Sequence, residues 1–207
     1  MATLTRSQPP VFNLPNQLTA ARFVLALVLF GLIAYEMWLW CLAVFALAAL
    51  TDYLDGYFAR KQGLTSTLGR NLDPLVDKVL ICGAFIFLLP AAMAPGEEER
   101  WLLPWMVTVI VARELIITSL RSFMENQGGN FGADWLGKIK MGLQCAALIA
   151  IFVYLYAKVY DPYNGTALWV FARLRDGFIW ATLAATALSG LQYLWRAGQL
   201  YRGDKNS

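Results

Sequence analysis

The amino-acid sequence predicts an all-α integral membrane protein with six transmembrane helices and a short N-terminal interfacial segment. The 207 residues are 58% hydrophobic and only 15% charged, a balance outside the usual range of soluble domains. A helix needs roughly 20 apolar residues to cross a bilayer, where every backbone polar group must be paired internally. We place the six apolar stretches at about residues 18–35, 38–58, 74–95, 101–123, 139–160 and 177–195.

A single helical membrane domain is expected to account for nearly the whole chain. The connections between the apolar stretches are too short for an independent soluble domain. We therefore predict a cytoplasmic or interfacial segment over residues 1–17, a six-helix domain over residues 18–197 and a cytoplasmic tail over residues 198–207. No small-residue cleavage site follows the first stretch, so we do not expect a cleaved signal peptide.

Prolines and small polar residues indicate where two of the helices begin. Asn13 can cap a helix that begins near Pro15, because a proline in the first turn removes no backbone hydrogen bond. The third membrane helix is expected to begin near Gly69 or Asp73, with Pro74 tolerated in its first turn.

The positions of lysine and arginine predict the orientation in the membrane. If the N-terminus is cytoplasmic, most of these residues lie at the inner side, as the excess of positive charge on cytoplasmic loops requires. Both termini are therefore expected inside. The expected outer loop over residues 161–176 is an exception, because Arg173 and Arg175 lie in it.

The residue types that are missing narrow the possible chemistry. The sequence has no histidine, which excludes a histidine base and a histidine-based metal site. Cys41, Cys82 and Cys145 fall inside the expected spans and have neither disulfide nor zinc-ligand spacing. A metal ion, if one is bound, must be held by oxygen ligands.

Four aspartates lie near the ends of two expected spans, where an ionised side chain is costly. Asp52 and Asp55 are three positions apart and Asp73 and Asp77 are four apart, so each pair projects from one helix face. If these two faces turn toward each other, the four carboxylates form a pocket and repel one another, and one or two divalent cations would relieve that repulsion. Oxygen ligands suit Mg²⁺ or Mn²⁺. A two-cation site can hold both oxygens of an in-line phosphoryl transfer, which indicates a diphosphate substrate.

Small residues and an arginine accompany these aspartates. Gly56 and Gly69 leave room for backbone or a nucleotide to come close, and Ala59 adds little bulk one turn after Asp55. Arg60 offers planar donors for a phosphate group. The pattern therefore predicts a nucleotide diphosphate beside the cations.

The complete pattern of residues 52–77 resembles the signature of the CDP-alcohol phosphatidyltransferase family and matches it at every position. The resemblance implies six membrane helices in a homodimer. It further implies that Asp52, Asp55 and Asp73 hold one metal ion and that Asp52, Asp73 and Asp77 hold a second, with Asp77 also deprotonating the acceptor hydroxyl. The positions that would receive the cytidine diphosphate group are Gly56, Ala59, Arg60 and Gly69.

Further segments resemble the bacterial phosphatidylglycerophosphate synthase branch of this family, namely residues 13–22, 112–121 and 135–140. This resemblance implies that CDP-diacylglycerol and glycerol 3-phosphate react to give phosphatidylglycerophosphate and CMP. It places the enzyme in the bacterial cytoplasmic (inner) membrane with its active site facing the cytoplasm and with no nucleic-acid partner. Thr19 and Arg22 would then help to bind the nucleotide or its phosphates.

A group of cations is expected to bind a phosphorylated acceptor. Arg113 lies within the fourth expected span, although a pair with the neighbouring Glu114 would also explain an arginine at that depth. Arg121, Lys138 and Lys140 cluster nearby, although positive-inside topology alone would explain these three.

Other functions are open from the sequence alone. Within the same family, the acceptor could be inositol phosphate, serine or phosphatidylglycerol. An intramembrane prenyltransferase also holds Mg²⁺ and diphosphate with aspartates, but its motifs lack the continuation from Asp55 to Arg60. A divalent-cation transporter would use intramembrane carboxylates, but it leaves Gly56, Gly69 and the cationic cluster unexplained.

Overall fold

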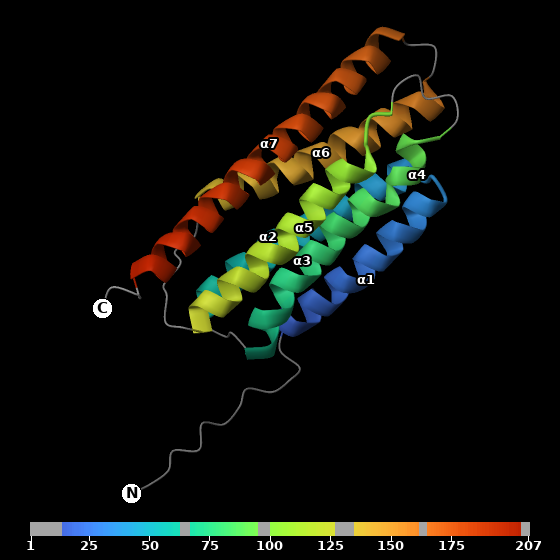
Figure 1. The fold of residues 1–207 in the computed structure, drawn as a ribbon. Coiled ribbons are helices and arrows are strands. Elements are labelled where there is room, and N and C mark those ends of the chain that lie inside the picture. The colour runs from blue at the N-terminus through green and yellow to red at the C-terminus, as the bar shows by residue number, and fades with distance from the viewer. Residues whose placement is uncertain (1–13, 63–66, 95–99, 127–134, 162–164, 204–207) are drawn as a thin grey trace, which may run out of the picture. The chain divides into compact units, whose positions relative to one another are not determined.

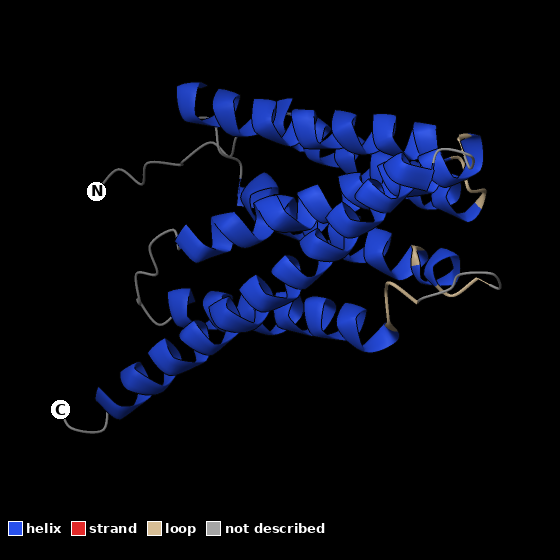
Figure 2. Cartoon of the chain, turned by 90° about the horizontal axis from the view of Figure 1, so that it is seen from above, coloured by secondary structure: helices blue, strands red, loops and turns tan. Residues whose placement is uncertain are grey.

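The structure is a computed structural model that describes residues 14–62, 67–94, 100–126, 135–161 and 165–203. Across these ranges every regular element is a helix and no strand occurs, as Figures 1 and 2 show. The chain divides into two compact units, Met1–Gly83 and Ala84–Ser207. The all-α prediction is therefore confirmed for the described part of the chain.

The N-terminal unit contains α1 (Leu14–Ala34), α2 (Trp38–Gln62) and most of α3 (Thr67–Phe87). The start of α1 agrees with a helix that begins near Pro15. α1 packs along α2 after a tight turn in which Glu36 adopts a left-handed conformation, with φ of 57°. That turn returns the chain within a few residues, so the two helices run antiparallel.

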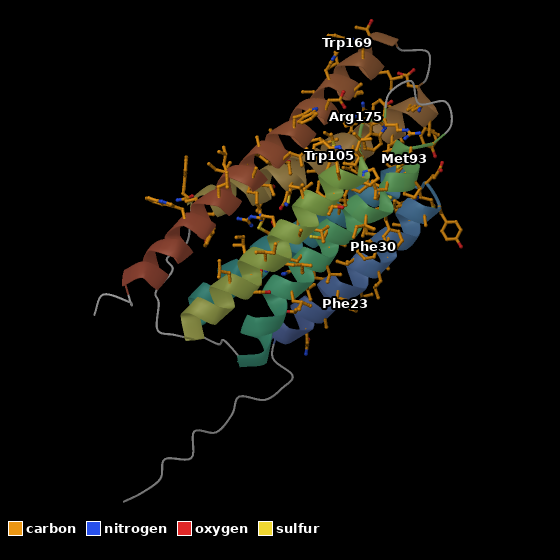
Figure 3. All side chains as sticks on the ribbon, in the orientation of Figure 1. Phe23, Phe30, Met93, Trp105, Trp169 and Arg175 are labelled. Carbon is orange, nitrogen blue, oxygen red and sulfur yellow. The ribbon has the colours of Figure 1, made fainter. Side chains whose placement is uncertain are left out.

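A glycine of α3 makes room for an aromatic side chain of α1 within this unit. Phe30 lies on α1, as Figure 3 shows, and a Cβ atom added to Gly83 of α3 would overlap its aromatic ring. Only glycine leaves this space open. This contact links α3 to α1, the helix that also carries Arg22.

The third helix begins two residues before Gly69, one of the two predicted starts, and is interrupted near its end. α3 begins at Thr67, so Pro74 lies inside the helix, where it removes one backbone hydrogen bond. α3 ends at Phe87, and a separate single turn, α4 (Leu89–Ala92), follows. Pro90 has no N–H to continue the α3 ladder, so the helix is interrupted at Leu88. The segment Leu75–Ala92 is still long and apolar enough to cross a bilayer, in agreement with the span expected over residues 74–95.

The C-terminal unit contains α5 (Pro104–Asn126), α6 (Trp135–Tyr160) and α7 (Gly165–Gly203). α6 packs along α7, and α5 also contacts α7 (Figure 1). α5 starts three residues later than predicted, because Pro104 suits the first position of a helix. The three helices together form the core of this unit.

The last helix is much longer than predicted. α7 has 39 residues, whereas we expected a loop over residues 161–176 followed by a span over residues 177–195. Arg175 explains the error, because it lies on α7 (Figure 3) with only 4% of its surface exposed. The guanidinium group of Arg175 is enclosed by other side chains, so its charge does not require a solvent-exposed loop at this position.

Four residues make up the Arg175 cluster: Arg175, Asp176, Trp101 and Tyr154. The guanidinium carbon of Arg175 lies 4.7 Å from the ring centre of Trp101 and 4.1 Å from that of Tyr154. Its Nε donates a hydrogen bond to Asp176 Oδ1 over 2.8 Å. Aromatic faces attract a cation, and the carboxylate balances its charge. The cluster therefore joins α6, α7 and the segment before α5.

The distribution of side chains is that of a membrane protein. Large apolar side chains such as Val24, Leu115 and Trp180 are exposed along the helices, while polar and charged side chains are buried between them. Two described segments, Leu75–Ala92 and Gly137–Tyr160, are long and apolar enough to cross a bilayer. The total of six spans stays a prediction. Where the structure describes the side chains, the buried polar ones are Thr19, Arg22, Glu114, Lys140, Gln144, Arg175, Thr182, Thr186 and Ser189.

Candidate active site

In the N-terminal unit, an ion pair joins α1 to the predicted catalytic base on α3. Arg22 Nη1 donates a hydrogen bond to Asp77 Oδ1 over 2.7 Å. The arginine side chain is 1% exposed and the aspartate 23%, so the pair lies at the edge of the protein interior. Thr19, one helical turn before Arg22, is also buried. Arg22 of α1 is therefore paired with Asp77, the carboxylate that the sequence predicts to be the base.

The other predicted metal ligands lie on the same two helices as expected. Asp52 and Asp55 belong to α2, and Asp73 and Asp77 belong to α3. Asp77 is the only one of the four whose side chain the structure describes, so the predicted convergence of the carboxylates stays a prediction. The side-chain surroundings of the predicted nucleotide-binding positions Gly56, Ala59, Arg60 and Gly69 likewise lie outside the described part.

In the C-terminal unit, a buried ionic network connects all three long helices. We define the Glu114 cluster as Arg113 and Glu114 of α5, Lys140 of α6 and Ser189 of α7. Arg113 Nη1 donates to Glu114 Oε1 over 3.2 Å, and Lys140 Nζ donates to the same oxygen. Arg113 Nη2 donates to Ser189 Oγ over 2.6 Å. The side chains of Arg113, Glu114 and Lys140 are 12% exposed or less.

The serine in this cluster is oriented to accept a hydrogen bond from the arginine. Ser189 Oγ donates its own proton to the backbone carbonyl of Thr186 over 3.3 Å, which leaves the oxygen lone pairs for Arg113. The ring of Tyr193, one turn further along α7, lies 6.0 Å from the guanidinium carbon of Arg113. α7 therefore fixes one side of the guanidinium group.

Among the described side chains, the Glu114 cluster contains two cations and a single carboxylate. The net charge of these three groups is therefore positive. Arg113 Nε and the amide nitrogen of Gln144, one turn after Lys140, are buried and have no acceptor among the described residues. A buried cation without sufficient counter-charge is unfavourable unless an anion joins it. The arrangement suits a ligand rich in acceptor oxygens, such as a phosphate group.

The structure brings together two of the four cations predicted to bind the acceptor. Arg113 and Lys140 share Glu114 Oε1, which also shows that the alternative pairing of Arg113 with Glu114 does occur. Lys138 is exposed, and the side chain of Arg121 lies outside the described residues. Ser189 was not among the predicted residues, because a serine within an apolar stretch gives no distinctive signal.

Comparison with known sequences identifies the family. The sequence profile described as CDP-alcohol phosphatidyltransferase matches residues 12–188. The chain belongs to the CDP-alcohol phosphatidyltransferase family. The match covers most of both units of this phosphatidyltransferase and confirms the resemblance found in residues 52–77.

Bacterial relatives resemble this phosphatidyltransferase over most of their length. The CDP-diacylglycerol–glycerol-3-phosphate 3-phosphatidyltransferase of Bacillus subtilis (strain 168) is 35% identical over 178 residues, which cover 77% of this chain and 88% of the relative. The enzymes of the same name from Pectobacterium atrosepticum and Salmonella paratyphi A are 33% and 31% identical. These alignments cover 68% and 93% of this chain, and 76% and 97% of the respective relatives.

Family membership decides between the classes of protein that the sequence left open. The chain is an enzyme of the phosphatidyltransferase class and a membrane protein, not an intramembrane prenyltransferase or a cation transporter. The family is in general dependent on divalent metal ions. The carboxylate donors predicted on α2 and α3 are of the chemical type that such ions prefer.

Proposed function

We propose that this phosphatidyltransferase transfers a phosphatidyl group from CDP-diacylglycerol to glycerol 3-phosphate, with phosphatidylglycerophosphate and CMP as products. The Glu114 cluster carries the proposal for the acceptor, because its excess of positive charge and donors suits a phosphate group. The names of the three bacterial relatives support the same pair of substrates. An acceptor without a phosphate, such as serine, would leave this charge unbalanced.

The donor side of the proposal rests on the N-terminal unit. Asp52, Asp55, Asp73 and Asp77 would hold two Mg²⁺ or Mn²⁺ ions, which when bound neutralise the diphosphate and stabilise the departing CMP. Their spacing of three and four positions on two helices fits a set of oxygen ligands. The cytidine diphosphate group would lie against Gly56, Ala59, Arg60 and Gly69, with Thr19 close by.

Asp77 takes the proton of the acceptor hydroxyl in this proposal. The hydroxyl oxygen attacks the phosphorus that carries diacylglycerol, the bond from that phosphorus to the CMP oxygen breaks, and the hydroxyl proton moves to the Asp77 carboxylate. Arg22 holds Oδ1 of this carboxylate at 2.7 Å and so orients it. This assignment gives Arg22 a role in positioning the base, in addition to the predicted role in binding the donor.

The proposed arrangement in the membrane follows the sequence analysis. A six-span domain over residues 18–197, an interfacial segment over residues 1–17 and a tail over residues 198–207 would have both termini inside a bacterial inner membrane. The buried and charge-balanced Arg175 supports this orientation, because it no longer counts as an exposed positive charge at the outer side. The lipid donor would enter from the bilayer and the acceptor from the cytoplasm, in a homodimer.

An assay of the purified full chain tests this function. With CDP-diacylglycerol, labelled glycerol 3-phosphate and Mg²⁺, we expect labelled phosphatidylglycerophosphate and stoichiometric CMP, and no product after chelation of the metal. In competition, glycerol 3-phosphate should be preferred over serine, inositol phosphate and phosphatidylglycerol. Preferential use of any of these three would overturn the assigned acceptor.

The variant Asp77→Asn tests the proposed base. We expect turnover to be lost while CDP-diacylglycerol binding persists, because the amide keeps the shape of the carboxylate but accepts no proton at neutral pH. Turnover and equilibrium binding of the donor are measured on the same preparation. Wild-type activity in this variant would refute the assignment.

A further inference from the structure

Glu114 occupies a position that the phosphate-binding proposal alone does not explain. A carboxylate in a site for a phosphate dianion would ordinarily repel the ligand. Here it lies between the two cations, and its Oε1 accepts hydrogen bonds from both Arg113 Nη1 and Lys140 Nζ. The two donor nitrogens therefore lie within a few ångströms of each other around one oxygen.

The two cations come from different helices and differ in rigidity. Arg113 is fixed on its other side by Ser189 and faces the ring of Tyr193. Lys140 carries its charge at the end of a flexible four-carbon stem, which can take many conformations. Two like charges this close repel in a poorly solvated interior unless a counter-charge lies between them. Glu114 accepts a hydrogen bond from each cation and so offsets this repulsion.

Glu114 accepts only one hydrogen bond from each of the two cations. A lysine ammonium has three donors and an arginine guanidinium has five, and Glu114 Oε1 takes one from each. A phosphate group has several acceptor oxygens on one centre, so it can bridge two neighbouring cations. The fixed spacing of Arg113 and Lys140 is thus the property that a phosphate ligand requires.

We propose that Glu114 is a positioning residue that holds Lys140 beside Arg113 at the spacing required to bind the phosphate of the acceptor. The inference rests on the proposed function for the identity of that ligand. Glu114 acts through the two cations and does not touch the reacting atoms. Its loss should weaken phosphate binding even though the total positive charge of the site rises.

Direct binding measurements on the full chain test this role. We expect Glu114→Gln, which keeps the side-chain size and removes the charge, to weaken the binding of both glycerol 3-phosphate and inorganic phosphate by about tenfold or more. Titration calorimetry in detergent with Mg²⁺ present gives these affinities without any turnover. The KM for glycerol 3-phosphate should rise in parallel, while the KM for CDP-diacylglycerol stays unchanged.

Two further variants separate positioning from loss of the fold. Glu114→Asp keeps the charge on a shorter stem and should recover part of the affinity, because it can still hold one of the cations. Glu36→Gln makes the same chemical change in the exposed turn between α1 and α2 and should leave the affinity unaltered. Thermal unfolding of each variant reports whether it folds, and if Glu114→Gln does not, Glu114→Asp provides the test.

The possible outcomes distinguish this inference from the proposed function. Unchanged phosphate affinity in Glu114→Gln, or wild-type affinity in Glu114→Asp when Glu114→Gln does not fold, would overturn the positioning role. Tighter binding in Glu114→Gln would also overturn it, because Glu114 would then compete with the ligand. If the wild type binds inorganic phosphate in a Glu114-dependent way but does not use glycerol 3-phosphate as acceptor, the inference stands and the proposed function fails. If the wild type binds neither inorganic phosphate nor glycerol 3-phosphate, the inference fails.

Discussion

Among the described residues of the C-terminal unit, Arg113 and Arg175 are both largely enclosed by protein, but their partners differ. Arg175 lies between two aromatic rings and bonds to its own carboxylate, Asp176. Arg113 shares its carboxylate, Glu114, with a second cation, Lys140. Arg175 and Ser189, the α7 partner of Arg113, are fourteen positions apart, or about 21 Å along the helix.

The difference between the two clusters indicates which one serves a ligand. In the Arg175 cluster one cation meets one carboxylate and lies against two aromatic faces, although its Nη1 is buried with no acceptor among the described residues. In the Glu114 cluster the positive charge exceeds the negative charge. A membrane protein keeps an unbalanced buried charge at a cost, which a function must offset. We therefore regard the Arg175 cluster as structural and the Glu114 cluster as the binding site.

The largest effect on this comparison is expected from removing the second cation of the Glu114 cluster. Lys140→Met leaves one cation and one carboxylate, so the site loses its net positive charge. We expect kcat/KM for glycerol 3-phosphate to fall by about two orders of magnitude, as loss of a charge-assisted contact to phosphate implies. Steady-state kinetics measure the change.

A lysine at the other end of the same helix provides the control for that variant. Lys158 lies in the last turn of α6, so Lys158→Met removes the same charge elsewhere on this element. Its kcat/KM for glycerol 3-phosphate should match that of the wild type. If Lys140→Met also retains full acceptor affinity, the distinction between the two clusters is lost.

A smaller effect, on stability rather than binding, is expected in the Arg175 cluster. Arg175→Leu removes two cation–aromatic contacts and a hydrogen bond, and we expect the free energy of unfolding to fall by about 2 kcal/mol. The KM for glycerol 3-phosphate should not change. Thermal unfolding in detergent and steady-state kinetics measure the two quantities.

The neighbouring Arg173 is a matched control for this substitution. It is exposed and faces a single ring, that of Trp169, at 5.4 Å. Arg173→Leu should therefore change stability much less than Arg175→Leu. A raised acceptor KM in Arg175→Leu without loss of stability would assign Arg175 to ligand binding and contradict the comparison.

The smallest effect is expected from the serine that holds Arg113. Ser189→Ala removes one hydrogen bond to the guanidinium group, while Glu114 still holds its other side. We expect the KM for glycerol 3-phosphate to rise about threefold to tenfold, with little change in kcat. A fall in kcat at unchanged KM would place the role of Ser189 outside acceptor binding.

Much of the helical architecture could be predicted because its signals are local. Apolar runs and the first-turn proline Pro15 lie within the elements that they define. The long α7 could not be predicted in this way. The rings that surround Arg175 belong to Trp101 and Tyr154, which are far from it in sequence, so the sequence around Arg175 resembles a charged loop.

In the candidate sites, too, features that lie within one sequence segment could be predicted, whereas contacts between distant residues could not. The family signature in residues 52–77 is local and could be read directly, and the family match confirms what it indicated. The ion pair of Arg22 with Asp77 and the pair of Lys140 with Glu114 join residues 55 and 26 positions apart. Periodicity within one helix cannot indicate such pairs, because they depend on how different helices pack.

The length of α7 has a consequence for the part of the protein in contact with water. A helix of 39 residues is about 58 Å long, while the hydrocarbon layer of a bilayer is about 30 Å thick. If α7 crosses that layer at the steep tilt of about 40° found for some membrane helices, roughly 19 Å of its axis extends beyond it. The span predicted within α7 would therefore continue into a hydrated helical extension, which would offer antibodies or proteases a helical target.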